Sequence, residues 1–101
     1  MARTSIRHQV VWRPLALKEL RAIIAYIGKD NASRAKSFGN ELRAKAALLA
    51  DHPLMGRAGR PGLPADLREL VAHSNYIVFY RVLSDTRTVE IVTVRHTARQ
   101  V

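Results

Sequence analysis

The sequence predicts an α+β fold in which an antiparallel sheet carries a helical hairpin on one face, in the order β-α-α-β-β-β. Two observations lead to this prediction. Apolar residues recur at helical spacing over residues 14–49, and residues 67–96 hold three runs rich in β-branched and aromatic residues. Two amphipathic helices alone would leave their apolar stripes half open, so the later strands are needed to cover them.

The chain should begin with a short strand followed by a helix. In the stretch HQVVW, Val10 and Trp12 share one face of a strand. Pro14 suits the first helical turn, where its missing N–H costs nothing. The helix has one apolar stripe, made by Leu17, Leu20, Ile24 and Ile27. Gly28 is expected to end it, because glycine tolerates the left-handed conformation common at helix ends.

A second helix is expected almost immediately afterwards. Asp30 or Asn31 can cap its first turn by accepting a backbone hydrogen bond. Its apolar stripe is made by Ala35, Phe38, Leu42, Ala46 and Leu49. A link of about three residues between the two helices favours an antiparallel hairpin.

Residues 51–66 hold three of the four prolines and three of the five glycines, which predicts a loop. Neither side of this loop is large enough to fold well alone, so we expect residues 1–101 to form a single domain. Strands are predicted within 67–72, 76–82 and 88–96, because the breaks between them are short enough for hairpins.

Composition narrows the classes of function. The chain has no cysteine, which excludes disulfides and thiolate chemistry. No apolar run approaches the ~20 residues that span a bilayer, and the start lacks the apolar centre of a secretory signal, so a cytoplasmic location is expected. The formal charge is +9, and 13 of the 17 basic residues are arginine. Arginine binds carboxylate or phosphate as a fork, so an acidic protein or a nucleic acid is the expected partner.

The usual signatures of an active site or metal centre are missing from the sequence. Its histidines are scattered, without an i,i+4 pair or an acid at ligand spacing: His8, His52, His73 and His96. Gly56, Gly59 and Gly62 follow a helix rather than a strand, so they do not form a dinucleotide fingerprint. Neither a metal nor a cofactor is expected. The aromatic residues of 76–82 are interpreted as core rather than as a platform for stacking bases.

What remains is a group of basic residues in the loop and the predicted strands, namely Arg57, Arg60, Arg68, Arg81, Arg95 and His96. An antiparallel meander can bring them to one face or one end of the sheet, where they would form an anion-binding surface. Alternatively, the strand arginines only decorate a solvated face, paired with acids such as Glu69 and Glu90. Spacing alone leaves both interpretations open.

Five phrases of the sequence are familiar when taken together: WRPLALKELRAIIAYI, DNASRAKSFGNEL, LADHPLMGRAGR, LRELVAHSNYIVFYRV and VEIVTVRHTARQ. Their order, over about residues 8–100, resembles the ParE branch of the RelE/ParE superfamily. These are the toxins of bacterial type II toxin–antitoxin systems, also called plasmid-stabilisation proteins. The resemblance implies a RelE/ParE-like fold and a cognate antitoxin that neutralises the toxin in a hetero-oligomer.

The resemblance leaves two activities to weigh, because ParE-like toxins are described as poisoning DNA gyrase whereas RelE-like relatives cut messenger RNA on the ribosome. A shared fold does not decide between them. In a nuclease, Arg68 and Arg81 would stabilise charge and His96 would transfer a proton. The ending RHTARQ resembles ParE, and the tail has no tyrosine. Gyrase inhibition without catalysis is therefore favoured, with RNA cleavage or a non-toxic basic binding module as alternatives.

On this interpretation, the basic residues form a surface that contacts the target or the antitoxin, and Arg99 extends it beyond Arg95 and His96. Antitoxins commonly present a disordered acidic or amphipathic segment that folds on the toxin. We expect such a segment to occupy an apolar groove beside the helical hairpin. Residues of the helix stripes, such as Leu17, Ile24 and Leu42, are the hypothetical lining of that groove.

Overall fold

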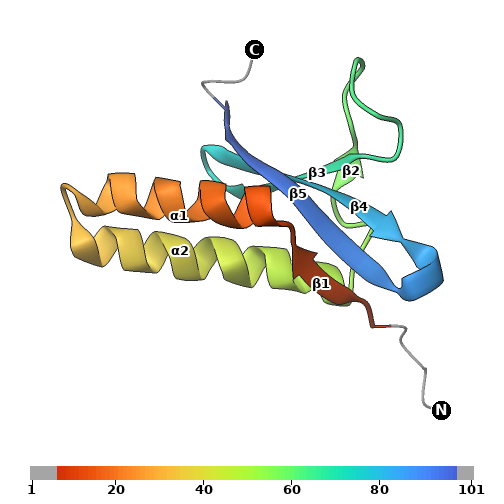
Figure 1. Cartoon of the computed structure of the whole chain (residues 1–101), viewed down its shortest axis with the longest axis horizontal. Helices are drawn as coiled ribbons and strands as arrows, with labels where there is room; N and C mark the ends of the chain where they lie inside the picture. The colour runs from red at the N-terminus through yellow and green to blue at the C-terminus, as the bar shows by residue number, and fades with distance from the viewer. Residues whose placement is uncertain (1–6, 98–101) are drawn as a thin grey trace.

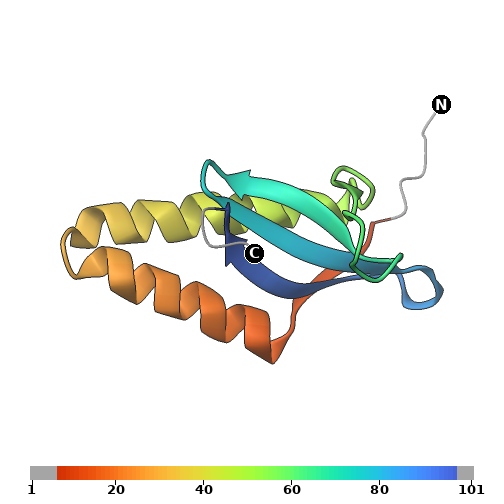
Figure 2. The ribbon, with the colours of Figure 1, turned by 90° about the horizontal axis from the view of Figure 1, so that it is seen from above.

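Two helices pack on one face of a five-stranded sheet in the computed structural model, which describes residues 7–97 (Figure 1). In chain order the elements are β1 (Gln9–Trp12), α1 (Pro14–Gly28), α2 (Ala32–Ala47), η1 (Leu48–Ala50), β2 (Arg57–Ala58), β3 (Arg68–His73), β4 (Tyr76–Leu83), η2 (Ser84–Thr86) and β5 (Thr88–His96). The predicted α+β class and the helical hairpin on one sheet face are confirmed. Figure 2 shows the helices side by side, with their connecting turn reaching beyond the sheet.

The sheet is mixed, with the strand order β1-β5-β4-β3-β2. β1 runs parallel to β5, and Trp12 lies opposite Ile91, while the remaining pairs are antiparallel as predicted. The parallel pair was not predicted, because it joins the first and last strands and no local pattern encodes the direction of so distant a pairing. A second addition is the two-residue strand β2, which lies within the predicted loop.

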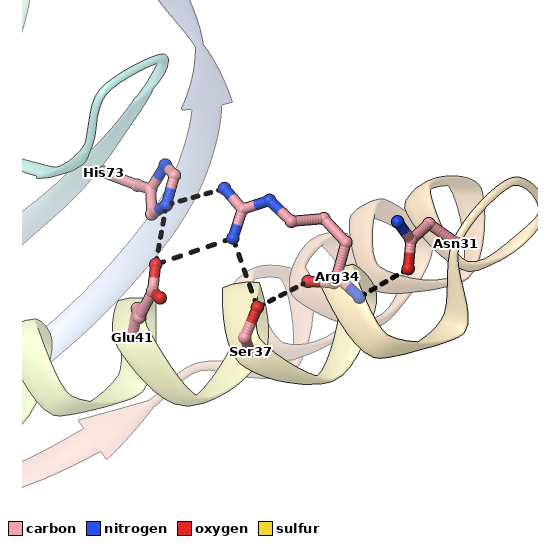
Figure 3. Close-up of polar contacts among 5 residues, drawn as sticks. All are labelled: Asn31, Arg34, Ser37, Glu41 and His73. Atoms are coloured by element: carbon pink, nitrogen blue, oxygen red, sulfur yellow. Dashed lines mark hydrogen bonds and ion pairs between the residues drawn. The ribbon is translucent and has the colours of Figure 1, made fainter.

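The helices follow their predicted stripes. All five residues of the second predicted stripe are buried: Ala35, Phe38, Leu42 and Ala46 in α2, and Leu49 in η1. Asn31 rather than Asp30 caps α2, since its Oδ1 accepts a hydrogen bond of 2.9 Å from the Arg34 N–H (Figure 3). Gly28 is the last residue of α1 as expected, but it does not adopt the left-handed conformation, and Lys29 continues in right-handed geometry.

The main core lies between the helices and the sheet. Leu20 and Phe38 from the helices meet Val78, Tyr80 and Ile91 from the central strands, and all five are at most 1% exposed. A much smaller cluster occupies the opposite sheet face, where Val92 packs against Leu67, Ile77 and Phe79. The predicted alternation of β4 is therefore confirmed, and the helix-free face of the sheet is only partly covered.

Polar contacts tie α2 to the end of β3. His73 Nε2 lies 3.0 Å from Glu41 Oε1 and 3.3 Å from an Arg34 nitrogen (Figure 3). A single ring nitrogen either donates or accepts, so only one of these contacts is a hydrogen bond in a given protonation state. The ring also packs edge-on against Phe38, with 4.9 Å between ring centroids. His73 thus links helix and sheet instead of pointing into a ligand site.

Candidate protein-binding surfaces

One buried carboxylate organises the basic loop on the helix-free face of the sheet. Glu69, whose side chain is 2% exposed, lies opposite Phe79 in the sheet register. Arg60 grips it as a fork, with distances of 2.9 and 3.0 Å, and Arg57 approaches to 3.4 Å. The hydrogen bond from Arg60 lowers the pKa of Glu69 below its ordinary value, against the opposing effect of burial. The carboxylate is therefore charged at neutral pH.

The ion pair fastens the loop close to the strand beside it. β2 pairs with β3, with Arg57 opposite Glu69. At Gly59, a Cβ atom would lie only 2.5 Å from the carbonyl oxygen of Leu67, so only glycine permits this approach. Arginine–carboxylate pairing was anticipated, but with other partners. Glu69 pairs with the loop arginines, and Glu90 pairs with Arg13 at 3.2 Å.

Arg68 and Arg81 lie on opposite faces of the sheet. Arg68 is opposite Tyr80 in the register, so it shares the helix-side face, and Arg81 follows Tyr80 directly and faces the other way. The Arg68 guanidinium donates hydrogen bonds to the carbonyl oxygens of Leu54 at 3.2 Å and Gly56 at 2.6 Å. Arg81 lies 3.5 Å from a carboxylate oxygen of Asp66. Each guanidinium thus has a separate structural partner.

His96 lies at the far end of the sheet from Arg81. It is opposite Tyr76, and the two rings meet edge-on with 4.8 Å between centroids. Tyr76 precedes Arg81 by five residues along β4, which corresponds to about 17 Å. The three side chains that the nuclease alternative requires, Arg68, Arg81 and His96, do not share a site in this structure.

A basic groove crosses the helix-free face between the loop and β5. Its volume is about 640 Å³, and it is lined by Arg60, Pro61, Leu63, Phe79, Thr93, Arg95 and Thr97. Of its two arginines, Arg95 is the more exposed, with 58% of its side chain in solvent, against 40% for Arg60. The structure thus brings Arg60 and Arg95 to one groove, as the meander allowed. Arg99 lies outside the described residues.

A second groove runs between α1 and β5. It has a volume of about 560 Å³ and is lined by Glu19, Ala22, Ile23, Tyr26, Tyr76, Val94, Arg95 and His96. β1 pairs with β5 only as far as Ile91, so the rest of that strand edge has no strand partner among the described residues. Glu19 lies at this edge, where its Oε1 accepts hydrogen bonds from the Val94 N–H at 2.9 Å and the Thr93 hydroxyl at 2.7 Å.

This groove lies beside the helical hairpin, as predicted, but its lining is not the predicted one. Leu42 is fully buried in the core, which excludes it from any open groove. Ile24 lines a separate hollow between α1 and α2, and Leu17 lines neither of the two. The lining instead includes Ile23 and Tyr26, which sequence reasoning missed because they lie off the main stripe of α1. Their apolar character outside the stripe was the available signal. Tyr26 is 64% exposed, whereas Ile23 is partly buried against the core.

Residues 7–97 contain neither a membrane-spanning helix nor a cluster of metal-ligating side chains. Over residues 7–97, no helix is long and apolar enough to cross a membrane. Nor does this part of the chain contain a group of three or more histidine, cysteine, aspartate or glutamate residues placed to hold a metal ion.

Residues 10–101 match the family described as the ParE toxin of the type II toxin–antitoxin system, parDE. This chain belongs to the ParE toxin family. It is 40% identical over 91 residues to toxin RelE2 of Caulobacter vibrioides, an alignment that covers 90% of this chain and 97% of the relative. The RelE/ParE-type identity inferred from the sequence phrases is thereby confirmed.

Solved structures show that the ParE-family fold is shared more widely. A chain of the chromosomal ParDE system of P. aeruginosa has a TM-score of 0.75 at 19% identity, covering 91% of this chain and 98% of that one. A chain of the RelBE2 toxin–antitoxin complex of Mycobacterium tuberculosis has a TM-score of 0.62 at 21% identity, covering 94% and 97%. A mutant of the E. coli toxin RelE in the free state has a TM-score of 0.58 at 20% identity, covering 92% and 85%. At these identities the likeness concerns the fold alone.

Proposed function

We propose that this ParE-family toxin inhibits DNA gyrase by binding it, without catalysis of its own, and that a cognate antitoxin neutralises it in the cytoplasm. The separation of Arg68, Arg81 and His96 carries the proposal. Transfer of a proton beside a stabilised phosphate charge needs acid or base and cation within a few ångströms of each other. Here Arg68 is engaged with loop carbonyls, and His96 lies at the other end of the sheet from Arg81.

The groove between α1 and β5 supports the antitoxin part of the proposal. An extended segment can pair with the edge of β5, displacing Glu19 from the Val94 N–H, while its apolar side chains pack on Ile23 and Tyr26. Acidic residues in that segment would meet Arg95, whose side chain is 58% exposed. Tyr26→Asp should therefore weaken antitoxin binding at least about tenfold, measured by calorimetry with the purified pair.

Gyrase supercoiling is the direct test of the target. Purified toxin is added to gyrase and relaxed plasmid at fixed salt, beside an unrelated protein of equal positive charge. The toxin is expected to block supercoiling and to accumulate cleaved DNA, whereas the control protein is expected to do neither. His96→Gln and Arg81→Gln should still inhibit, because the loss of one contact weakens binding but removes no chemical step.

Two outcomes would contradict this proposal in different ways. Normal supercoiling together with ribosome-dependent cleavage of messenger RNA, lost in His96→Gln, would establish the RelE-type activity instead. Growth unaffected by the toxin, combined with tight binding to bare DNA that falls steeply with salt, would indicate a non-toxic basic binding module.

A further inference from the structure

The loop between η1 and β2 exposes two apolar side chains next to each other. Leu54 is 66% exposed and Met55 is 38% exposed. Together with His52 and Pro53 they line an open concavity of about 630 Å³. Neither grooved surface described above includes these residues. An exposed leucine next to an exposed methionine forms an apolar patch, and such patches mark sites of protein–protein contact.

The backbone that carries this patch is fixed from the sheet below it. Tyr80, fully buried in β4, donates its hydroxyl proton to the Pro53 carbonyl at 2.8 Å and accepts the Gly56 N–H at 2.9 Å. Arg68 donates to the Leu54 and Gly56 carbonyls. These bonds occupy polar groups on both sides of Leu54. The loop is therefore held in one conformation, and that conformation leaves the Leu54 side chain in solvent.

Close packing under the loop reinforces this conformation. A Cβ atom at Gly56 would lie 2.4 Å from the Glu69 carbonyl oxygen and 2.8 Å from the Tyr80 hydroxyl. Only glycine lets the loop lie this close to β3 and β4. The apolar patch is thus displayed by a rigid support rather than by a flexible loop that could fold it inward.

We propose that Leu54 and Met55 form an anchor that inserts into an apolar pocket on the toxin's target protein. This inference rests on the proposed function, because it presupposes that the target is a protein. A preorganised anchor loses little conformational freedom on binding, and an apolar side chain filling a pocket carries much of the affinity of an interface. The methionine adapts to the walls of such a pocket. Neither side chain offers anything to the phosphates of a nucleic acid.

The charges around the anchor specify the rim of the partner's pocket. Arg57, with 75% of its side chain exposed, follows the anchor in the chain. Its guanidinium touches Glu69 on one side and leaves the rest toward solvent. A pocket rimmed by carboxylates would complement this arrangement. The antitoxin is assigned elsewhere, because a segment that folds on its partner needs a long groove and an open strand edge, and β5 beside α1 offers both.

The test compares two surface leucines changed in the same way. Leu54→Asp removes the anchor, and Leu15→Asp, at a residue 53% exposed in the first turn of α1, is the matched control. Asp is well tolerated in a first helical turn. Leu54→Asp should raise the toxin concentration for half-maximal gyrase inhibition at least about tenfold and leave antitoxin affinity within about twofold of wild type. Leu15→Asp should change neither value.

Growth arrest on expression without antitoxin separates failure of the anchor from failure of the proposed target. If the wild type arrests growth but leaves gyrase untouched, gyrase is the wrong target, and loss of arrest in Leu54→Asp would still support the anchor. Wild-type potency in Leu54→Asp would overturn the anchor. The anchor would also be overturned if Leu54→Asp lost antitoxin affinity but still inhibited gyrase, and if the milder Leu54→Ser variant gave the same result. If the wild-type protein neither arrests growth nor inhibits gyrase, both the proposed function and the proposed target contact are wrong.

Discussion

The two faces of the sheet are stabilised by different means. On the helix side, Phe38 and Leu42 close over Tyr80 and Ile91, leaving these side chains at most 1% exposed. On the other side, only a small cluster around Phe79 is buried, and a charged side chain, Glu69, fastens the loop. Apolar burial therefore supplies most of the stability on the helix side. Ion pairs and hydrogen bonds hold the other face in shape while it stays open to a partner.

The largest expected difference between the faces comes from removing a ring on each. Phe38→Ala should lower the free energy of unfolding by about 4 kcal/mol, because the cavity is enclosed by helices and sheet. Phe79→Ala should cost about 3 kcal/mol, since its side of the sheet borders a groove that water can enter. Urea denaturation of the two variants measures both values. Equal losses would contradict the claim that the two faces are stabilised differently.

The next effect concerns the side chain that joins the two regions. Tyr80→Phe keeps the ring in the core but leaves the Pro53 carbonyl and the Gly56 N–H without their hydroxyl partner. We expect a loss of about 2 kcal/mol, measured by thermal and urea unfolding. Tyr26→Phe, at an exposed position, is the control and should change stability by less than about 0.5 kcal/mol. A Tyr80→Phe variant as stable as wild type would show that the loop is not held from the sheet.

Acid should weaken the charged face selectively. The pKa of Glu69 is lowered in the folded state, so the ionised carboxylate stabilises the fold above the ordinary value of about 4.3, and this contribution disappears as pH falls through the lower, folded pKa. Glu69→Gln should therefore be less stable than wild type by about 1.5 kcal/mol at pH 7. The two proteins should converge well below pH 4. A difference that persists unchanged at low pH would mean that shape, not charge, accounts for the effect.

The smallest effect is expected at an ion pair exposed to solvent. Arg81→Gln removes the contact with Asp66, whose side chain is 64% exposed. Such pairs contribute little, so stability should change by less than about 0.5 kcal/mol, measured by the same urea titration. A loss close to that of Glu69→Gln would show that the outer pair is also part of the scaffold.

Local patterns predicted the elements of this fold well. The stripe ending at Leu49 and the cap at Asn31 depend on residues three or four apart, and the alternation of β4 depends on residues two apart. Contacts between residues this close in the chain can be predicted from the spacing of residue types. The parallel pairing of β1 with β5 has no such local signature, and it was not predicted.

For the candidate sites, the sequence likewise predicted the residue types but not their partners. Composition identified the loop and its arginines, but not that Arg68 turns to the loop carbonyls while Arg60 grips Glu69. Glu19 and Tyr26 escaped notice because their importance arises from the neighbouring strand edge, which depends on where β1 stops. Arginine was recognised as a binding residue in general. Its partner at each position depends on sheet register.

Residue types and their local spacing were enough to predict the helices, the strands of the meander, the basic charge and the family. Each of these depends on residue type and on spacing within a few positions. Tertiary structure alone decided which face each arginine occupies, where the edge of β5 stays open and why Leu54 remains in solvent. These features arise when segments distant in the chain meet, as Tyr80 meets Pro53 and Gly56, and such meetings depend on strand register and packing rather than on local pattern.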